Sequence, residues 1–340
     1  MTVLVLPSNR PAARFYRGGR RITDFRGEPP AAEYEPEDWV GSVTPVNGEA
    51  PAGQTTLPDG TLLADAIAAE PRWWLGPAHV ASFGADPMLL VKLLDAGQRL
   101  PVHAHPDGAW AAAHLGTAHG KTEAWYVLTP GEVHLGLARD LERAELDDIV
   151  ARQDVASLLG AMHRLEVGPG DVVYVPAGVL HAIGEGILLV ELQEPEDLSI
   201  LAEWHGFAID GPAKGHLGVG FDTALGAVEH RARSAAEIAG LVHRAGGDGP
   251  LLPSAAEAFF RLEHVRVDGS AELDPGFAIG VVLDGEVDAA AHGNSVPDAG
   301  GGVGVSRLVR GSTVVLPHAA GVVRVTGAGE LLVCRPPLPR

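Results

Sequence analysis

GQRLPVHAHP, at residues 97–106, and GDVVYVPAGVLH, at residues 170–181, are the two stretches that decide the fold of this chain. In the first, His103 and His105 stand two residues apart in a β-like run, so both imidazoles point to one face of a strand. In the second, residues 172–175 predict another strand, and a Pro-Ala-Gly turn then presents His181. Glu123 opens a third apolar run, AWYVL at 124–128. Three histidines and one glutamate near β-rich sequence predict a site for one divalent metal ion such as zinc.

The spacing of these residues resembles the two motifs of the cupin superfamily, Gly-x5-His-x-His and Gly-x5-Pro-x-Gly-x2-His. An ordinary cupin has its glutamate a few residues after the second histidine, whereas here residues 106–122 intervene. That insertion, together with GKTEAWY at 120–126, resembles class I mannose-6-phosphate isomerase. The resemblance continues through LVKLLDA at 90–96 and ELQEPED at 191–197, and it is dense from about residue 85 to residue 205.

The resemblance implies a zinc-dependent aldose–ketose isomerase that interconverts mannose 6-phosphate and fructose 6-phosphate without a redox cofactor. His103 stands where the family usually has glutamine, and imidazole is the stronger ligand for a transition metal. Lys121 lies two residues before Glu123, so on a strand it would point into the same cavity. Glu37 matches a further acidic position of the family. The implied metal ligands are His103, His105, Glu123 and His181, and the implied proton-transfer residues are Lys121, Glu191 and Asp197.

Two departures from the family pattern bear on activity. Leu201 stands where the family has an arginine, four residues after the aspartate that Asp197 matches. The family's His-Pro-Lys-Ser stretch is also missing, because residues 42–47 read SVTPVN. Weak turnover of a sugar phosphate is therefore expected unless another cation replaces the guanidinium. The basic candidates are Arg17, Arg20, Arg21 and Arg139.

The composition narrows the class of protein. The chain has 340 residues, 46% of them hydrophobic, and a formal net charge of −19, which argues against nucleic acid or an anionic membrane as a partner. Cys334 is the single cysteine, so no intrachain disulfide is possible. No apolar run approaches membrane-spanning length. We expect a soluble cytoplasmic protein acting on a small-molecule sugar phosphate, and the sequence does not specify its oligomeric state.

Short Val- and Leu-rich runs between glycines and prolines favour a mainly β chain with two cupin-type barrels and inserted helical segments. Residues 311–317, GSTVVLP, repeat 170–176 at an offset of 141, and the same offset puts Val322 in place of His181. The expected domains are a metal-binding catalytic cupin at 1–220, a helical linker at 221–255, and a second barrel without metal at 256–340. Helices are expected at 59–70, 107–114, 140–162 and 234–245, the last with a Ser234/Glu237 capping box.

Three other functions remain open at this point. The chain could be an isomerase of a different or an unphosphorylated sugar, or a sugar-binding or regulatory cupin that has lost turnover. A cupin dioxygenase is the third, since histidines and a carboxylate also hold Fe(II). The long segment before Glu123 argues against the dioxygenase.

Overall fold

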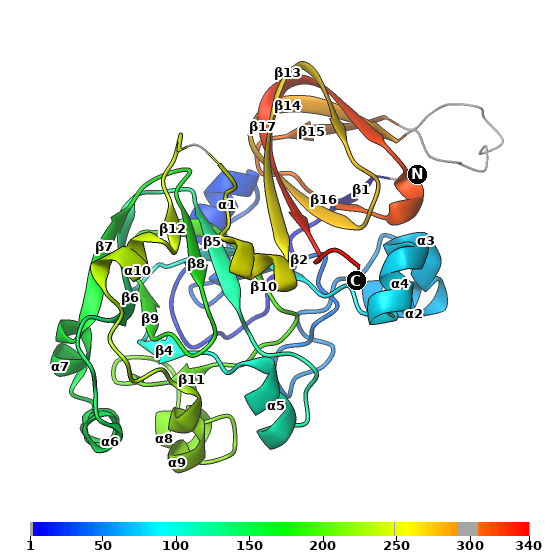
Figure 1. Cartoon of the computed structure of the whole chain (residues 1–340). Helices are drawn as coiled ribbons and strands as arrows, with labels where there is room; N and C mark the ends of the chain where they lie inside the picture. The colour runs from blue at the N-terminus through cyan, green and yellow to red at the C-terminus, as the bar shows by residue number, and fades with distance from the viewer. Residues whose placement is uncertain (1–2, 248, 292–304, 340) are drawn as a thin grey trace.

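The structure is a computed structural model that describes residues 3–247, 249–291 and 305–339. Its strands form three antiparallel sheets, and its helices lie at the periphery (Figure 1). The prediction of a mainly β chain is therefore confirmed. Within the described residues, no helix combines the length and the apolar character needed to cross a bilayer.

The first sheet carries one face of the site. Its six strands follow the order β12-β8-β5-β10-β3-β2. They are β2 (Glu37–Val40), β3 (Leu90–Asp95), β5 (Glu123–Val127), β8 (Val172–Val175), β10 (Leu188–Gln193) and β12 (Val242–His243).

The two faces of this sheet differ in polarity. Residues paired directly across antiparallel strands share a face, and Lys92 pairs with both Trp39 and Glu191. The face that carries Lys92 therefore also carries the buried polar residues of the neighbouring strands. The opposite face is apolar, and its Val91, Leu93 and Leu192 belong to one core cluster with Phe277 and Ile279 of the C-terminal sheet. Alternation along the strands thus separates a polar interior from a packing surface.

The second sheet supplies the histidines. Its order is β11-β4-β9-β6-β7, and His103 pairs directly with His181 between β4 and β9. Apolar residues of the same strands, such as Ala104 and Ile200, pack in a cluster with residues of the helices α6 (Arg143–Arg152) and α7 (Val155–Gly160). The strands are β4 (His103–Ala104), β6 (Gly131–Leu137), β7 (Met162–Val167), β9 (His181–Ile183) and β11 (Ile200–Leu201).

The C-terminal sheet lies beside the first sheet (Figure 1). β16 occupies the predicted offset of 141 from β8, because Thr313–Leu316 corresponds to Val172–Val175. One edge strand comes from the opposite end of the sequence: β1 pairs with β16. The strands are β1 (Leu4–Leu6), β13 (Arg261–Leu273), β14 (Ala278–Ala291), β15 (Val305–Val309), β16 (Thr313–Leu316) and β17 (Val323–Arg335).

The helices are short. Three single turns of 3-10 helix accompany them in the described residues: η1 (Leu225–Ala227), η2 (Ser254–Ala258) and η3 (His318–Ala320). The α-helices are α1 (Arg20–Arg26), α2 (Leu63–Ala69), α3 (Pro71–Leu75), α4 (Pro77–Phe83), α5 (Gly108–His114), α6 (Arg143–Arg152), α7 (Val155–Gly160), α8 (Gly211–Lys214), α9 (Phe221–Ala224) and α10 (Ala235–Ala239).

Helix α5 follows its prediction, with Asp107 as the N-cap that accepts from Trp110 N at 2.7 Å. Helix α2 begins four residues later than expected, after a turn in which Asp59 accepts from Thr61 N. The expected helix at 140–162 is wrong as one unit, because Gln153 adopts φ 53° and divides it into α6 and α7. The Ser234/Glu237 capping box is present, but α10 ends at Ala239, and the chain then pairs with β8 as β12.

Candidate metal centre and substrate pocket

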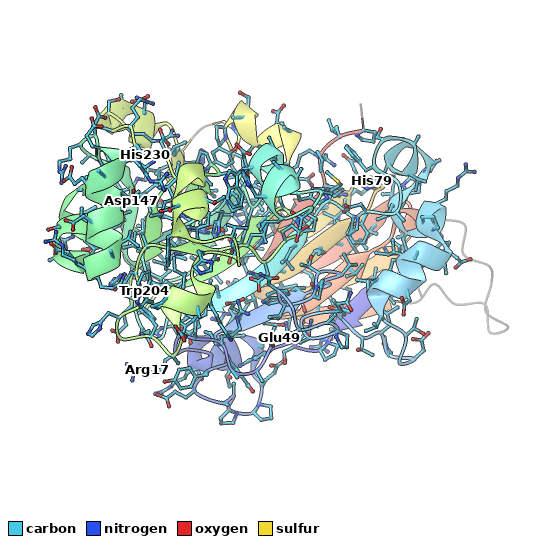
Figure 2. The ribbon with its side chains drawn as sticks, turned by 90° about the horizontal axis from the view of Figure 1, so that it is seen from below. Arg17, Glu49, His79, Asp147, Trp204 and His230 are labelled. Carbon is cyan, nitrogen blue, oxygen red and sulfur yellow. The ribbon has the colours of Figure 1, made fainter. Side chains whose placement is uncertain are left out.

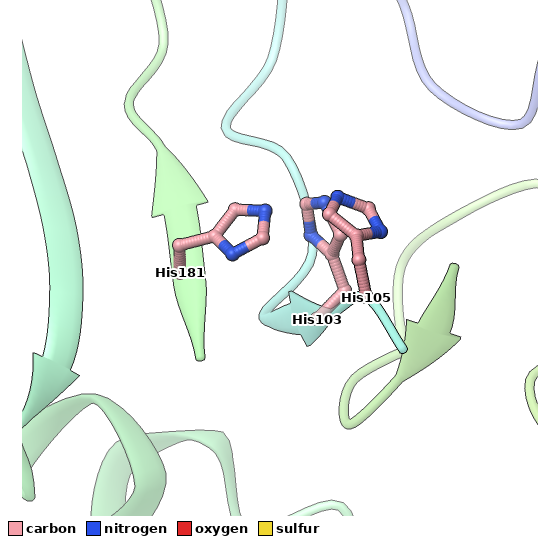
Figure 3. A group of neighbouring side chains, drawn as sticks. All are labelled: His103, His105 and His181. Carbon is pink, nitrogen blue, oxygen red and sulfur yellow. The ribbon is translucent and has the colours of Figure 1, made fainter. Parts of the chain in front are cut away.

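Three buried histidines face one another between the sheets. His103 and His181 come from the paired strands β4 and β9, and His105 follows β4 directly (Figure 3). One nitrogen from each ring lies within 4.8 Å of one nitrogen from each of the others. The alternation that places His103 and His105 on one face therefore acts as predicted, and the structure brings His181 to them.

The backbone fixes the tautomer of each ring. The Nδ1 atoms lie 2.8 Å, 2.6 Å and 2.8 Å from the carbonyl oxygens of Pro101, Leu198 and Val179, respectively. Because a carbonyl only accepts, each Nδ1 donates, and each Nε2 keeps its lone pair for the interior. Metal-binding histidines usually show this arrangement. The Nε2 of His181 is buried without a hydrogen-bond partner, which is costly unless an ion binds there.

Burial also keeps the rings neutral, which is the form that binds a metal. It lowers the pKa of His105 to about 3, with Lys121 adding to the effect. It lowers the pKa of His103 well below the usual value, helped by His181 and His105, and it lowers the pKa of His181 as well. The chemistry of these donors therefore fits a divalent ion of the zinc type.

Glu123, the fourth predicted ligand, lies beside two of the three histidines. Its Oε2 lies 3.0 Å from His105 Nε2, and its Oε1 lies 3.4 Å from His181 Nε2. Trp125 Nε1 donates to Oε1 at 2.8 Å, and Lys121 Nζ donates to Oε2. Burial raises the pKa of Glu123, but Lys121 and the histidines outweigh it and hold that pKa well below its usual range. The group is therefore an oriented carboxylate.

Lys121 and Glu191 lie next to these four residues. Lys121 Nζ donates to Glu191 Oε1 at 3.1 Å and lies 2.8 Å from His105 Nε2. Burial lowers the pKa of Lys121, but Glu123 and Glu191 outweigh it and raise that pKa, so the amine stays charged. Burial raises the pKa of Glu191 to about 7, even though Lys121 and Lys92 oppose the shift. Glu191 is thus a carboxyl that can gain or lose a proton near neutral pH.

Asp197, the third predicted proton-transfer residue, lies farther out with Arg14 and Glu37. The Arg14 guanidinium is 3.1 Å from Glu37 Oε1 and 3.4 Å from Asp197 Oδ1. Tyr16 and Trp39 each donate to Glu37 at 2.7 Å. Burial raises the pKa of Asp197, but Arg14 outweighs it and lowers that pKa. Asp197 therefore stays ionised, and this makes it a poorer proton shuttle than Glu191.

Arg14 and Lys92 are site residues that the sequence analysis missed. Lys92 Nζ is 3.5 Å from Glu37 Oε2 and faces the polar interior from the middle of β3. A single lysine within the apolar strand LVKLLD was the available signal for it. Arg14 lies outside any helix or strand, and no periodicity marks it.

The position of Arg14 depends on a tertiary contact. The segment that follows it packs against the end of β3, where Asp95 Oδ2 accepts from Gly19 N and Arg21 N, both at 2.8 Å. A Cβ atom on Gly18 would lie 2.0 Å from the carbonyl oxygen of Asp95, so this close approach requires glycine.

The four arginines suggested as substitutes for the missing guanidinium lie elsewhere. Arg17 projects at the edge of the molecule (Figure 2) and pairs with Glu33. Arg21 pairs with Asp95, and Arg139 pairs with Glu145. Arg20, in α1, is almost fully exposed beside Asp24. The structure therefore places Arg14, and not these four, at the site.

Two adjacent cavities lie beside these residues. The inner pocket, about 40 Å³, is lined by His103, Lys121, Glu123 and Glu191 among others. The outer cavity, about 310 Å³, is lined by Leu201 and Lys214 among others. Four residues line both spaces and form their junction: Arg14, Phe15, Asp197 and Ser199. A third space of about 600 Å³, the side cavity, also reaches Asp197.

Leu201 lies at the wall of the outer cavity. It is buried, and it pairs with His103 between β11 and β4, so both side chains share one face. The Leu201 side chain therefore gives the outer cavity an apolar wall near His103.

Curated relatives share part of this sequence. A mannose-6-phosphate isomerase from Streptococcus mutans is 35% identical over 187 residues, which are 53% of this chain and 54% of that protein. The mannose-6-phosphate isomerase ManA from Bacillus subtilis is 40% identical over 112 residues, or 32% of this chain and 34% of ManA. This chain thus spans about half or less of the length of the relatives it matches. No family model matches it.

Solved structures share the whole fold. The mannose 6-phosphate isomerase of Bacillus subtilis superposes with a TM-score of 0.71 at 22% identity, over 98% of this chain and 100% of that one. A mutant of the phosphomannose isomerase from Salmonella typhimurium gives a TM-score of 0.72 at 16% identity, over 99% and 100%. The resemblance to mannose-6-phosphate isomerases is therefore confirmed, in sequence over about half of this chain and in fold over nearly all of it.

Proposed function

We propose that this chain is a zinc-dependent aldose–ketose isomerase that interconverts mannose 6-phosphate and fructose 6-phosphate. The observation that carries the proposal is Glu191. It is a buried carboxyl with a pKa of about 7, hydrogen-bonded to a charged lysine beside three histidines that fit a metal ion. The named relatives support the same reaction.

His103, His105, His181 and Glu123 would hold the ion, which as a Lewis acid polarises sugar oxygens when bound. The donor set of three imidazoles and one carboxylate supports zinc. Fe(II) would suit similar donors, so the identity of the metal as zinc is itself a proposal.

The isomerisation moves one proton between two carbons. The Glu191 carboxylate would take the proton from C2 of the aldose and return it to C1, through a cis-enediol. The Lys121 ammonium, 3.1 Å from Glu191, would donate a proton to O1 as the enediol forms and take one back from O2 as the ketose forms. No hydrogen is gained or lost overall, so no redox cofactor is required.

Arg14 would replace the guanidinium that the family's arginine supplies at the position of Leu201. Its side chain is largely buried at the junction of the inner pocket and the outer cavity, where Glu37 and Asp197 hold it. A substrate that lies across this junction would contact the planar guanidinium of Arg14, which carries several N–H donors. Asp197 would then position Arg14, and it would not carry the proton itself.

Replacing Arg14 by glutamine should lower kcat for mannose 6-phosphate by about 10²–10³-fold, the cost of removing one donor that acts on developing charge. Arg14→Lys should recover part of the loss, because it keeps the charge without the fork. Arg17→Gln is the matched control, since Arg17 is about half exposed and belongs to the same segment. Near wild-type kcat for Arg14→Gln, with an unchanged unfolding midpoint, would exclude Arg14 from the reaction.

The direct test of the proposed function is a steady-state assay of the purified chain with mannose 6-phosphate, and with fructose 6-phosphate in the reverse direction. We expect turnover in both directions. Sugar binding in a calorimeter without conversion would favour a non-catalytic sugar-binding protein. Conversion of unphosphorylated mannose alone would indicate a different isomerase.

The same proposal extends to architecture and location. The proposed division is a catalytic cupin barrel at 1–220, a linker at 221–255 and a metal-free barrel at 256–340, with β12 of the linker segment added to the first sheet. Because β1 pairs with β16, residues Leu4–Leu6 belong to the C-terminal sheet. The net charge of −19 and the sugar-phosphate chemistry support a cytoplasmic enzyme whose partner is a small molecule.

A further inference from the structure

The lysines of this chain are few and gathered in one place. The sequence contains three lysines and 22 arginines. Lys92 and Lys121 line the inner pocket, and Lys214 lines the outer cavity. Everywhere else in the chain a positive charge is carried by arginine. Lysine differs in presenting a compact charge on a flexible stem, so its use at these three positions points to function.

Lys214 is the one cation among these residues whose charge is not already engaged. Arg14, Lys92 and Lys121 are each ion-paired with a buried carboxylate. Lys214 is exposed at the end of α8, and its ammonium group makes no hydrogen bond or ion pair with the residues that the structure describes. The adjoining backbone is fixed, because Leu201 N donates to Gly215 O at 2.8 Å. Lys214 is therefore held beside the wall that Leu201 forms.

The size of the cavities dictates how a hexose phosphate would lie. The inner pocket, at about 40 Å³, has room for only about three waters. The outer cavity, at about 310 Å³, falls in the range of small-molecule sites. A sugar whose reacting carbons enter the inner pocket must therefore extend its other end past Arg14 into the outer cavity.

The charges of the two larger cavities favour the outer one for an anion. In the outer cavity, Asp197 is neutralised by Arg14, Asp210 caps α8 through Ala213 N at 3.2 Å, and Glu49 is exposed. The side cavity is lined by Asp86, Glu196 and Asp197 and by no described lysine or arginine, and its His119 is already paired with Asp86. It therefore offers a phosphate no unpaired cation.

We infer that Lys214 binds the phosphate group of the sugar phosphate in the outer cavity. The inference rests on the proposed function. Lysine suits the role because it meets phosphate as a mobile point charge. Because the only other described lysine or arginine that lines this cavity, Arg14, is held by Glu37 and Asp197, the Lys214 ammonium would distinguish a phosphorylated sugar from a neutral one.

The test compares Lys214→Met, which keeps the length of the side chain, with Lys214→Arg, which keeps its charge. For mannose 6-phosphate we expect Lys214→Met to raise KM and the calorimetric Kd about tenfold or more, the effect of one charge-assisted hydrogen bond, with kcat within about twofold. Lys214→Arg should stay within about threefold of the wild type. Inorganic phosphate should inhibit Lys214→Met more weakly than the wild type.

Arg324→Met is the matched control, because it removes one exposed positive charge from the C-terminal sheet and changes the net charge equally. Added salt should weaken mannose 6-phosphate binding to the wild type more than to Lys214→Met. Salt screens the attraction between the Lys214 ammonium and the phosphate, and the variant lacks that ammonium. Unchanged KM and Kd in Lys214→Met, or an equal loss of affinity for mannose and mannose 6-phosphate, would overturn the inference. A wild type that binds mannose 6-phosphate through Lys214 without converting it would overturn only the isomerase proposal.

Discussion

Replacing Glu191 by glutamine should lower kcat for mannose 6-phosphate by about 10²–10⁴-fold, the usual contribution of a positioned general base. Glutamine has the same shape and can still accept from Lys121, which donates to Glu191 at 3.1 Å. What it loses is the capacity to take a proton. A loss of rate with a retained fold would therefore report proton transfer and not packing.

The pH profile provides an independent readout of the same residue. Burial raises the pKa of Glu191 to about 7. A base must be deprotonated to work, so activity should fall as pH falls through this pKa. A bound divalent cation favours the ionised form of Glu191 and so lowers its pKa. The fall of kcat/KM at low pH, the acid limb of the profile, should therefore be centred at or below about pH 7. Glu191→Gln should abolish that limb in whatever activity remains.

Glu185→Gln is the matched control for this prediction, because Glu185 is an exposed carboxylate just before β10. Solvent-deuterium incorporation into the product separates proton transfer from binding, and it should be lost together with kcat. If Glu191→Gln kept kcat within tenfold of the wild type and kept the acid limb, the base would have to be another group.

Replacing His181 by alanine should eliminate tight binding of the single divalent ion. The Nε2 of His181 is buried without a hydrogen-bond partner, and its Nδ1 donates to Val179 O at 2.8 Å. Loss of a ligand should weaken metal affinity by more than the 10–100-fold that loss of an outer-shell partner costs. Isomerase activity should fall with it, as it should in the wild type after chelation.

Metal content after gel filtration and competition with a chelator measure this effect. The unfolding temperature gives a second readout, because an ion present at 1,000 times its Kd stabilises the folded state by about 4 kcal/mol. That stabilisation should appear in the wild type and in His205→Ala, whose imidazole is exposed, but not in His181→Ala. Reloading with zinc, iron(II), cobalt or manganese identifies the metal that restores the most activity. An unaltered metal affinity in His181→Ala would show that its burial has another cause.

The candidate site could be predicted largely because its residues lie on strands. Two-residue spacing puts His103 and His105 on one face, and a turn of fixed composition follows β8 and presents His181. Both rules depend only on residues that are close together in the chain, so they can be applied to a single sequence. Arg14 could not be found in this way, since its place depends on the tertiary contact between Gly18 and Asp95.

The helices show the same limit. Gln153 is a good helix former by composition, yet its left-handed conformation ends α6, and residue type alone does not reveal this. The capping box at Ser234 was readable because both partners lie within four residues. The early end of α10 was not, because strand pairing between Val242 and Val173 competes with the helical pattern.

The pairing of β1 with β16 has a consequence for biosynthesis. Leu4 and Val315 are neighbours in the sheet but about 310 residues apart in the chain. At about 5–20 residues per second, the ribosome takes on the order of 15–60 s to reach the partner of β1. For that time β1 has no strand to pair with, and β16 is born with an unpaired edge of the kind that recruits other chains. The pairing of β1 must therefore wait until Thr313–Leu316 has been synthesised.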